Sequence, residues 1–146
     1  MDKPLLKEQA QKIFTAVEAI ERSLHKDLNN TDPDLTLPQL RTLMVVARNE
    51  YCTMSELGRL TGYAASALTG IIDRMIKKRL VVRVGDDNDR RIVKVAATRK
   101  GIGLAQEHYR KIVKHISAIL EKASLSERAK IVNLIEKIAG SFGDRR

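Results

Sequence analysis

The side chains of this 146-residue chain that could do chemistry are mainly cationic, and several of them follow a run of small residues. The small residues between positions 64 and 70 are Ala64, Ala65, Ser66, Ala67, Thr69 and Gly70. The basic residues that follow are Arg74, Lys77, Lys78 and Arg79. Small side chains let a backbone approach a second surface closely, and lysine and arginine bind phosphate groups. This arrangement predicts a surface that binds a polyanion.

The distribution of charge supports this prediction. The chain has a net charge of +9, and residues 1–36, 37–101 and 102–146 carry net charges of −2, +7 and +4. The basic middle segment also contains Arg90, Arg91 and Lys94. Such a segment indicates a polyanionic partner. The alternative is a basic surface that serves only solubility.

Residues for catalysis do not form a recognisable set. The sequence has no glycine-rich phosphate loop and no nucleophile elbow, so we expect neither an enzyme nor a cofactor. Asp86, Asp87 and Asp89 lack the later bidentate glutamate of a calcium loop, and we expect a polar turn there. We expect Asp73 to pair with a neighbouring base such as Lys77, four residues later on a helix.

The thiol and imidazole side chains are sparse. Cys52 is the only cysteine, so an internal disulfide is excluded. A redox switch is one interpretation of Cys52, but we favour a small buried residue. His108 and His115 share a helix face, and His25 lies on another predicted helix. A zinc sensor is conceivable, but no close pair of ligands supports it, so we expect no metal and exposed or interfacial histidines.

The apolar spacing predicts mainly helical elements around these residues. We expect a first helix over 5–28, a second from the capping Thr36 to about Asn49, and a third from the capping Thr53 to Gly62. A fourth covers 65–78, a fifth begins at Thr98, and a sixth follows a break at Ala123-Ser124. Short β-branched segments over 80–84 and 91–96 predict a hairpin with a turn over 85–89.

The third and fourth helices have the clearest buried sides. Leu57 and Leu60 are expected to face inward, and so is a stripe of the fourth helix formed by Leu68, Ile71, Ile72 and Met75. Two short helices joined at Gly62 and followed by a hairpin are typical of a winged helix-turn-helix. The second helix of this motif enters the major groove of double-stranded DNA, and an arginine of the hairpin can enter the minor groove.

We therefore predict double-stranded DNA as the partner. The predicted contact residues are Thr53, Ala64, Ala65, Ser66, Ala67, Thr69, Gly70, Arg74, Lys77, Lys78, Arg90, Arg91 and Lys94. The first two turns of the recognition helix lack Arg, Lys, Asn and Gln, the types that make most bidentate base contacts. We expect weak base readout there, with Arg74 and the lysines bound to phosphates and a steep dependence of affinity on salt.

With these motifs the chain resembles the MarR family of bacterial and archaeal regulators. The resemblance covers essentially the whole chain and rests on Met54-Ser-Glu-Leu-Gly-Arg-Leu-Thr-Gly62, Ile71-Ile-Asp-Arg-Met75, Asp89-Arg-Arg91 and Thr98-Arg-Lys-Gly101. It implies a transcriptional regulator, usually a repressor, that dimerises through its first, fifth and sixth helices. It also implies release from DNA when a small ligand enters the cleft between the dimer helices and the winged domain. By position, Asp89 would brace Arg91, and Arg91 would enter the minor groove.

Three positions depart from the family pattern. Arg79 stands where a glycine usually precedes the first wing strand, and Ala97 stands where a leucine usually precedes Thr98. Ala64 replaces the serine or threonine that usually caps the recognition helix. We therefore expect that helix to begin without a side-chain cap.

These observations predict a single domain over 1–146, a mainly α winged helix-turn-helix of six helices plus a β-hairpin wing. The DNA-binding region is expected at 37–101 and the dimerisation regions at 1–36 and 102–146, because the terminal helices are too long for the winged region alone to cover. A homodimer would bind a pseudo-palindromic operator. No segment is typical of a membrane span or a secretory leader, so we expect a cytoplasmic protein. The alternatives are an architectural DNA-binding protein without an effector, and a winged helix that binds protein.

Overall fold

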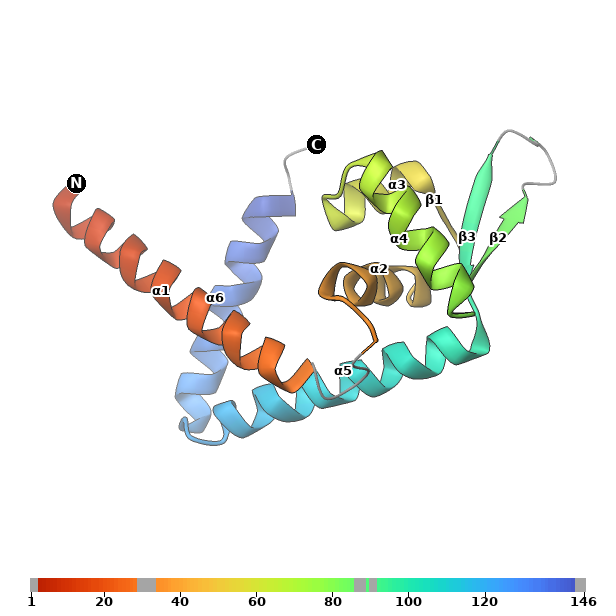
Figure 1. Ribbon diagram of the computed structural model, residues 1–146. Coiled ribbons are helices and arrows are strands. Elements are labelled where there is room, and N and C mark those ends of the chain that lie inside the picture. Colours follow the sequence, from red (N-terminus) through yellow and green to blue (C-terminus); the bar gives the residue numbers. More distant parts are fainter. Residues whose placement is uncertain (1–2, 29–33, 86–88, 90–91, 144–146) are drawn as a thin grey trace. The chain divides into compact units, whose positions relative to one another are not determined.

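The computed structural model describes residues 3–28, 34–85, 89 and 92–143 (Figure 1). The chain divides into two compact units, Met1–Arg110 and Lys111–Arg146, and each is described by itself. The first unit holds α1 (Lys3–Leu28), α2 (Leu37–Ala47), α3 (Met54–Thr61), α4 (Ala65–Lys77), a small sheet and the first half of α5 (Arg99–Leu120). The second unit holds the rest of α5 and α6 (Leu125–Gly143). The predicted mainly α class is confirmed.

Helices α2, α3 and α4 enclose an aliphatic core. Its fully buried side chains include Leu43 and Val46 of α2, Leu57 of α3, and Leu68, Ile72 and Met75 of α4. Burial of such side chains contributes about 1.5–3 kcal/mol each relative to exposure. The predicted stripe of α4 is confirmed, because Ile71 is buried with the other three residues.

The prediction that Leu60 faces inward is wrong, since 47% of this residue is exposed. Helix α3 has only eight residues, and Leu57 fills its contact with the core. The predicted ends of α3 are confirmed. The hydroxyl of Thr53 accepts a hydrogen bond from the Glu56 N–H at 3.2 Å, and Gly62 follows the helix with a φ of 76°.

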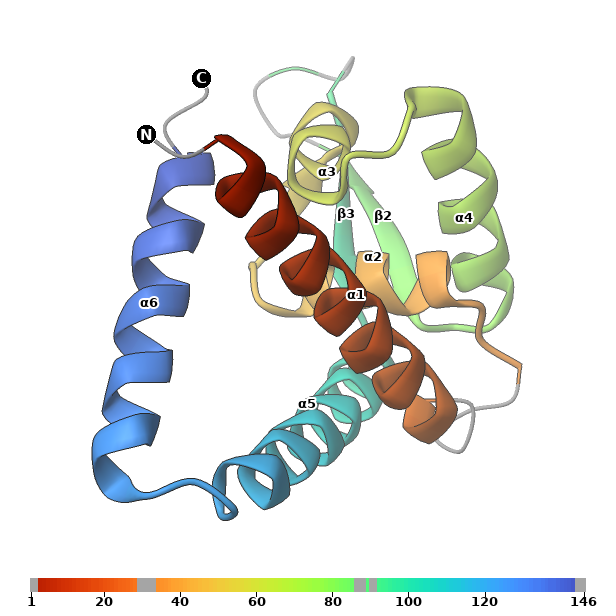
Figure 2. The ribbon, with the colours of Figure 1, turned by 90° about the vertical axis from the view of Figure 1, so that its left-hand side faces the viewer.

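The wing is part of a three-stranded antiparallel sheet in the order β1-β3-β2. The strands are β1 (Cys52–Thr53), β2 (Val81–Gly85) and β3 (Val93–Ala97). Strand β1 was not predicted, because two residues carry no recognisable alternation. Strand β2 is the outer strand of the wing and lies beside α4 (Figure 1 and Figure 2).

The start of α5 packs against the start of β2. The Thr98 N–H donates to the Leu80 carbonyl at 3.0 Å, and the Thr98 hydroxyl accepts a hydrogen bond from the Gly101 N–H at 3.0 Å. A Cβ atom on Gly101 would lie 2.1 Å from the Leu80 oxygen, so only glycine fits there. The predicted capping role of Thr98 is confirmed, and these contacts join the wing to α5.

Several helices carry large apolar side chains on their surfaces. In α1 the exposed residues include Ile13, Phe14, Val17 and Ile20. In the second unit they include Ile116 and Ile119 of α5 and Leu134, Ile135 and Ile138 of α6. The predicted break between these helices is confirmed, because the Ser124 N–H donates to the Glu127 carboxylate at 2.8 Å, as a capping residue does.

His108 lies inside the first unit and is only 3% exposed. The prediction of an exposed or interfacial histidine is therefore wrong for this residue. The neighbouring Ala105 is also buried, and it lies one turn earlier on α5. The first half of α5 thus packs against the rest of its unit, which its apolar spacing alone did not reveal.

Candidate nucleic-acid interface

The recognition helix α4 begins without a side-chain cap, as predicted. Its N-cap residue is Ala64, which has an extended backbone and no side chain that could accept a hydrogen bond from the first turn. Ala65, Ser66, Ala67 and Thr69 are exposed along the first turns. The Thr69 hydroxyl donates to the Ala65 carbonyl at 3.0 Å, so its proton is already used within the helix. The exposed surface of this part of α4 therefore consists of short, mostly apolar side chains.

The basic residues at the end of α4 have different surroundings. Arg74 and Lys77 are exposed. Lys78 is the C-cap residue, and its ammonium group donates to the backbone carbonyl of Asp34. The Lys100 ammonium group donates to the Lys78 carbonyl at 3.1 Å. Arg74 and Lys77 are thus exposed, whereas Lys78 is held by the segment before α2.

Asp73 pairs with a residue of the wing. Its carboxylate accepts a hydrogen bond from the Arg83 guanidinium at 2.7 Å, and both side chains are about half exposed. The prediction that Asp73 pairs with a neighbour such as Lys77 on its own helix is therefore wrong. The ion pair links α4 to the middle of β2 and helps to fix the wing beside the recognition helix.

The wing tip is only partly within the described residues. The predicted contact residues Arg90 and Arg91, and the turn residues Asp86 and Asp87, lie outside them. Asp89 is exposed, and its backbone carbonyl accepts a hydrogen bond from the Ile92 N–H at 3.0 Å. Its role as a brace for Arg91 stays a prediction.

Lys94 and Thr53 lie opposite each other on β3 and β1. The Lys94 ammonium group is 4.0 Å from the centroid of the exposed Tyr51 ring, a cation–π contact. Thr53 caps α3 together with Glu56, and its hydrogen bonds hold the pKa of the Glu56 carboxyl below its ordinary value. This carboxylate therefore stays ionised next to two predicted DNA-contact residues.

Cys52 is 2% exposed and packs in the core. Burial, assisted by the nearby Glu56 carboxylate, raises the pKa of its thiol above the ordinary value. A raised pKa reduces the thiolate form that reacts with oxidants. The interpretation as a small buried residue is confirmed. Within the described segments, no group of three or more Cys, His, Asp or Glu side chains is arranged for metal binding.

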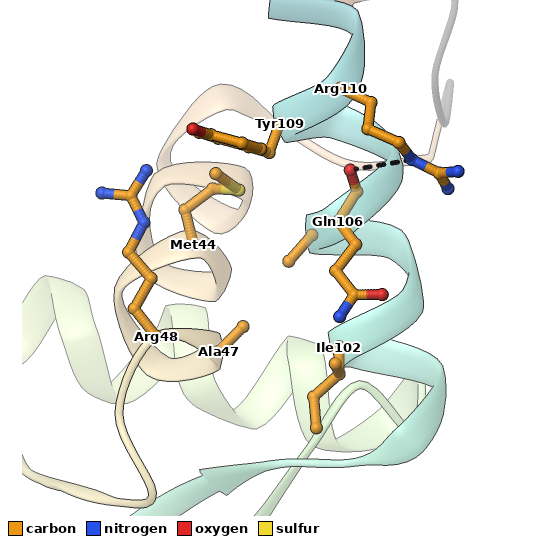
Figure 3. Close-up of a pocket in the computed structure, with 8 residues that line it drawn as sticks. Met44, Ala47, Arg48, Ile102, Gln106, Tyr109 and Arg110 are labelled. Atoms are coloured by element: carbon orange, nitrogen blue, oxygen red, sulfur yellow. Dashed lines mark hydrogen bonds between the residues drawn. The ribbon is translucent and has the colours of Figure 1, made fainter. Parts of the chain in front are cut away.

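A cavity of about 480 Å³ lies between α2 and the first half of α5. Figure 3 shows Met44 and Ala47 of α2, and Arg48 directly after it, on one side of the cavity, with Ile102, Gln106 and Tyr109 of α5 on the other and Arg110 pointing away from α2. The Arg48 guanidinium lies 6.0 Å from the centroid of the Tyr109 ring. The cavity is thus largely apolar, with a cation, a phenol and an amide at its margin, and its volume is typical of a small-molecule site.

The sequence reasoning did not identify these lining residues. Met44, Ala47 and Ile102 were counted as parts of apolar helix faces, and such faces do not reveal which positions line a gap. The sequence did contain one indication of the cavity. The polar residues Arg48 and Gln106 are close to otherwise apolar positions of α2 and α5.

Comparisons with known proteins find a family model that matches part of the chain and HTH-type transcriptional regulators as relatives. The MarR family profile matches residues 34–92. The uncharacterized HTH-type transcriptional regulator YfiV of Bacillus subtilis (strain 168) is 28% identical over 95 residues, which are 65% of this chain and 59% of YfiV. The chain thus matches less than two thirds of YfiV. The HTH-type transcriptional regulator FarR of Neisseria gonorrhoeae is 27% identical over 127 residues, 87% of this chain and 86% of FarR.

Solved structures show the same fold. A MarR family protein from Bacillus stearothermophilus has a TM-score of 0.89 and 23% identity, with 99% of each chain covered. NadR in complex with 4-hydroxyphenylacetate has a TM-score of 0.70 and 26% identity, with 88% of this chain and 89% of NadR covered. Among the helices described for this chain, none has the length and apolarity needed to cross a membrane.

Proposed function

We propose, from the premise that this chain belongs to the MarR family of transcriptional regulators, that it is a homodimeric repressor whose operator is a pseudo-palindrome. We further propose that a small molecule in the α2–α5 cavity releases it from DNA. It would act as a regulator and not as an enzyme, in the cytoplasm, where its operator lies.

The observation that carries the DNA-binding proposal is the exposed face of α4. Small residues cover its first turns, and the exposed Arg74 and Lys77 follow them. A recognition helix of this kind can lie deep in the major groove, with cations available for the DNA. The wing beside α4 would bring Arg91 to the adjacent minor groove, whose negative potential attracts arginine.

Exposed apolar side chains support the proposed homodimer. Phe14 of α1, Ile119 of α5 and Ile135 of α6 are between 49% and 64% exposed in the single chain. Exposed large apolar side chains on several helices are typical of protein–protein interfaces. A two-fold dimer presents two recognition helices, and these select two half-sites about one helical turn apart.

The cavity supports the proposed effector. It lies between α2, which packs on α3 and α4, and α5, which is joined to the wing at Leu80. A ligand that widens the gap would move the DNA-contacting elements relative to α5, and it releases DNA only if it binds the released conformation more tightly. Arg48, Gln106 and Tyr109 suit a small aromatic acid, which is also the kind of ligand named for NadR.

The test combines selection and titration. Duplexes selected from a random-sequence library should share a pseudo-palindrome with half-sites about 10 bp apart. Fluorescence anisotropy on the selected duplex should show that 4-hydroxyphenylacetate, used as a probe of the aromatic acids, weakens binding. Arg48→Ala should reduce this ligand effect and leave DNA affinity unchanged. Arg91→Ala should weaken DNA binding by about 1–3 kcal/mol, and Asp89→Ala by less.

Each part of the proposal has its own contrary result. A consensus with a single half-site would contradict the dimeric operator. Equal DNA affinity of the wild type and Arg91→Ala at moderate salt would contradict the role of the wing. An unchanged affinity in the presence of a panel of small aromatic acids would favour the alternative of a DNA-binding protein without an effector of this class.

A further inference from the structure

Arg74 does not extend straight out from the end of the recognition helix. Both terminal nitrogens of its guanidinium lie 3.7 Å from the position that a Cβ atom would take on Gly70, and its Cζ atom lies 3.9 Å from that position. Helical side chains lean toward the N-terminus and cover the preceding turn. The guanidinium of Arg74 therefore lies above Gly70, about 6 Å nearer the start of α4 than its own Cα position suggests.

The surroundings of Arg74 leave its guanidinium available. Within the part of the chain that the structure describes, it makes no hydrogen bond, ion pair or ring contact. Two other cations near the recognition helix are engaged, because Arg83 pairs with Asp73 and Lys78 is bound to the Asp34 carbonyl. The side chain of Arg74 is exposed beside the short side chains of the first turns, and a guanidinium carries five N–H donors.

This geometry changes the expected role of Arg74 from phosphate binding to base readout. A guanidinium fork makes two hydrogen bonds to the O6 and N7 atoms of guanine, the commonest specific contact in the major groove. We propose that Arg74 recognises one guanine in each operator half-site, and that Gly70 provides the space in which the guanidinium lies. This inference rests on the proposed function, because it assumes that α4 enters the major groove.

The experiment compares base preferences at every operator position. Wild type and Arg74→Lys would each be used to select duplexes from a random library, with Lys77→Ala as the control for a phosphate contact. Wild type should select a guanine at one position of each half-site, and Arg74→Lys should lose that preference, because lysine keeps the charge but not the fork. Lys77→Ala should bind all sequences more weakly and keep the preference.

A chemical change in the DNA tests the same contact without altering the protein. Replacement of the selected guanine by 7-deazaguanine removes the N7 acceptor and should weaken wild-type binding several-fold, within the roughly 5- to 150-fold range of a bidentate contact. The same replacement should change the affinity of Arg74→Ala by less than about 2-fold. An equal loss in both proteins would overturn the assignment.

Gly70 variants test the space beside the guanidinium. A methyl group at 3.7 Å is in ordinary contact, so Gly70→Ala should keep the guanine preference. Gly70→Leu should displace the guanidinium and reduce the ratio of guanine to adenine binding at that position, whatever happens to total affinity. If Arg74→Lys selects the same consensus as the wild type at every position, the role of Arg74 in base readout is overturned, but the proposed function is not. The absence of any consensus for the wild type would overturn the proposed function as well.

Discussion

Arg79 ends the recognition helix in a conformation that usually requires glycine. Its φ is 58°, the only positive value found at a non-glycine residue among the described positions. The Arg79 N–H donates to the Ile76 carbonyl at 2.8 Å, and the Leu80 N–H donates to the Met75 carbonyl at 3.0 Å. These two bonds form a Schellman motif. The left-handed conformation costs an L-residue roughly 1–2 kcal/mol, which the motif and the wing contacts offset.

Arg79→Gly should therefore stabilise the protein. Removal of the Cβ relieves the left-handed strain, and the greater freedom of glycine in the unfolded chain offsets part of the gain. We expect the free energy of unfolding to rise by about 0.5–1 kcal/mol in urea denaturation. Lys77→Gly, within the helix, is the control and should lower it by about 1 kcal/mol. If both variants lower the free energy of unfolding by a similar amount, the backbone at Arg79 is not strained.

Ala64 leaves the first N–H groups of α4 without a side-chain acceptor. Ala64→Ser supplies a hydroxyl at an extended N-cap residue and should stabilise the protein by about 1 kcal/mol. Ala67→Ser, three residues later inside the helix, has no such N–H groups to serve and should be slightly destabilising. Thermal unfolding of the three proteins measures the difference. If Ala64→Ser melts no higher than the wild type, the missing cap has no energetic consequence.

At the scale of elements, a close contact with backbone joins the start of α5 to Leu80, the residue before β2. The Cβ atom of an alanine at position 101 would overlap the Leu80 oxygen, and this contact is with backbone, which cannot rotate away. Gly101→Ala should therefore lower the free energy of unfolding by about 1–3 kcal/mol, which is the typical cost of overpacking. Gly103→Ala is the control, because nothing lies within 4 Å of its Cβ position, and it should be stabilising by up to about 1 kcal/mol. Equal stabilities of the two variants would contradict the tight contact.

Elements with local signals could be predicted from the sequence. Thr53, Gly62, Thr98 and Ser124 act within a few residues of their own positions, so their capping and stop roles follow from residue type and spacing. The buried stripe of α4 repeats over about two turns and is equally clear.

Contacts between distant segments could not be predicted in this way. Strand β1 exists because Cys52 and Thr53 pair with β3 more than forty residues later. The partner of Asp73 is on another element, and the burial of His108 depends on what α5 packs against. The cavity and the position of the Arg74 guanidinium depend on three-dimensional packing and side-chain direction, which residue spacing does not specify.

At the scale of the whole molecule, the exposed apolar faces predict self-association. Ile116 and Ile119 are 42% and 49% exposed, and burial of each in a dimer contributes up to about 1.5–3 kcal/mol. Light scattering at micromolar concentration should give the mass of a dimer. The double variant Ile116→Glu, Ile119→Glu should give monomers or insoluble chain, because two carboxylates would be buried without partners.

Lys114→Glu is the matched control, because it changes the net charge by the same two units at an exposed position of α5. It should remain dimeric. A monodisperse monomer of the wild type would contradict self-association. Loss of the dimer in both variants would show that net charge, and not apolar contact, decides the result.

The position of β2 has a consequence for how the protein behaves when concentrated. One edge of β2 pairs with β3, so the other edge carries backbone groups that a second chain could pair with. Val82 and Val84 are exposed on this strand, a combination that favours aggregation. The strand has only five residues, and its central Arg83 is fixed by Asp73. A short strand with a charge at its centre disfavours edge-to-edge association, so Arg83, whose ion pair helps to position the wing, also disfavours pairing of a second chain at this edge.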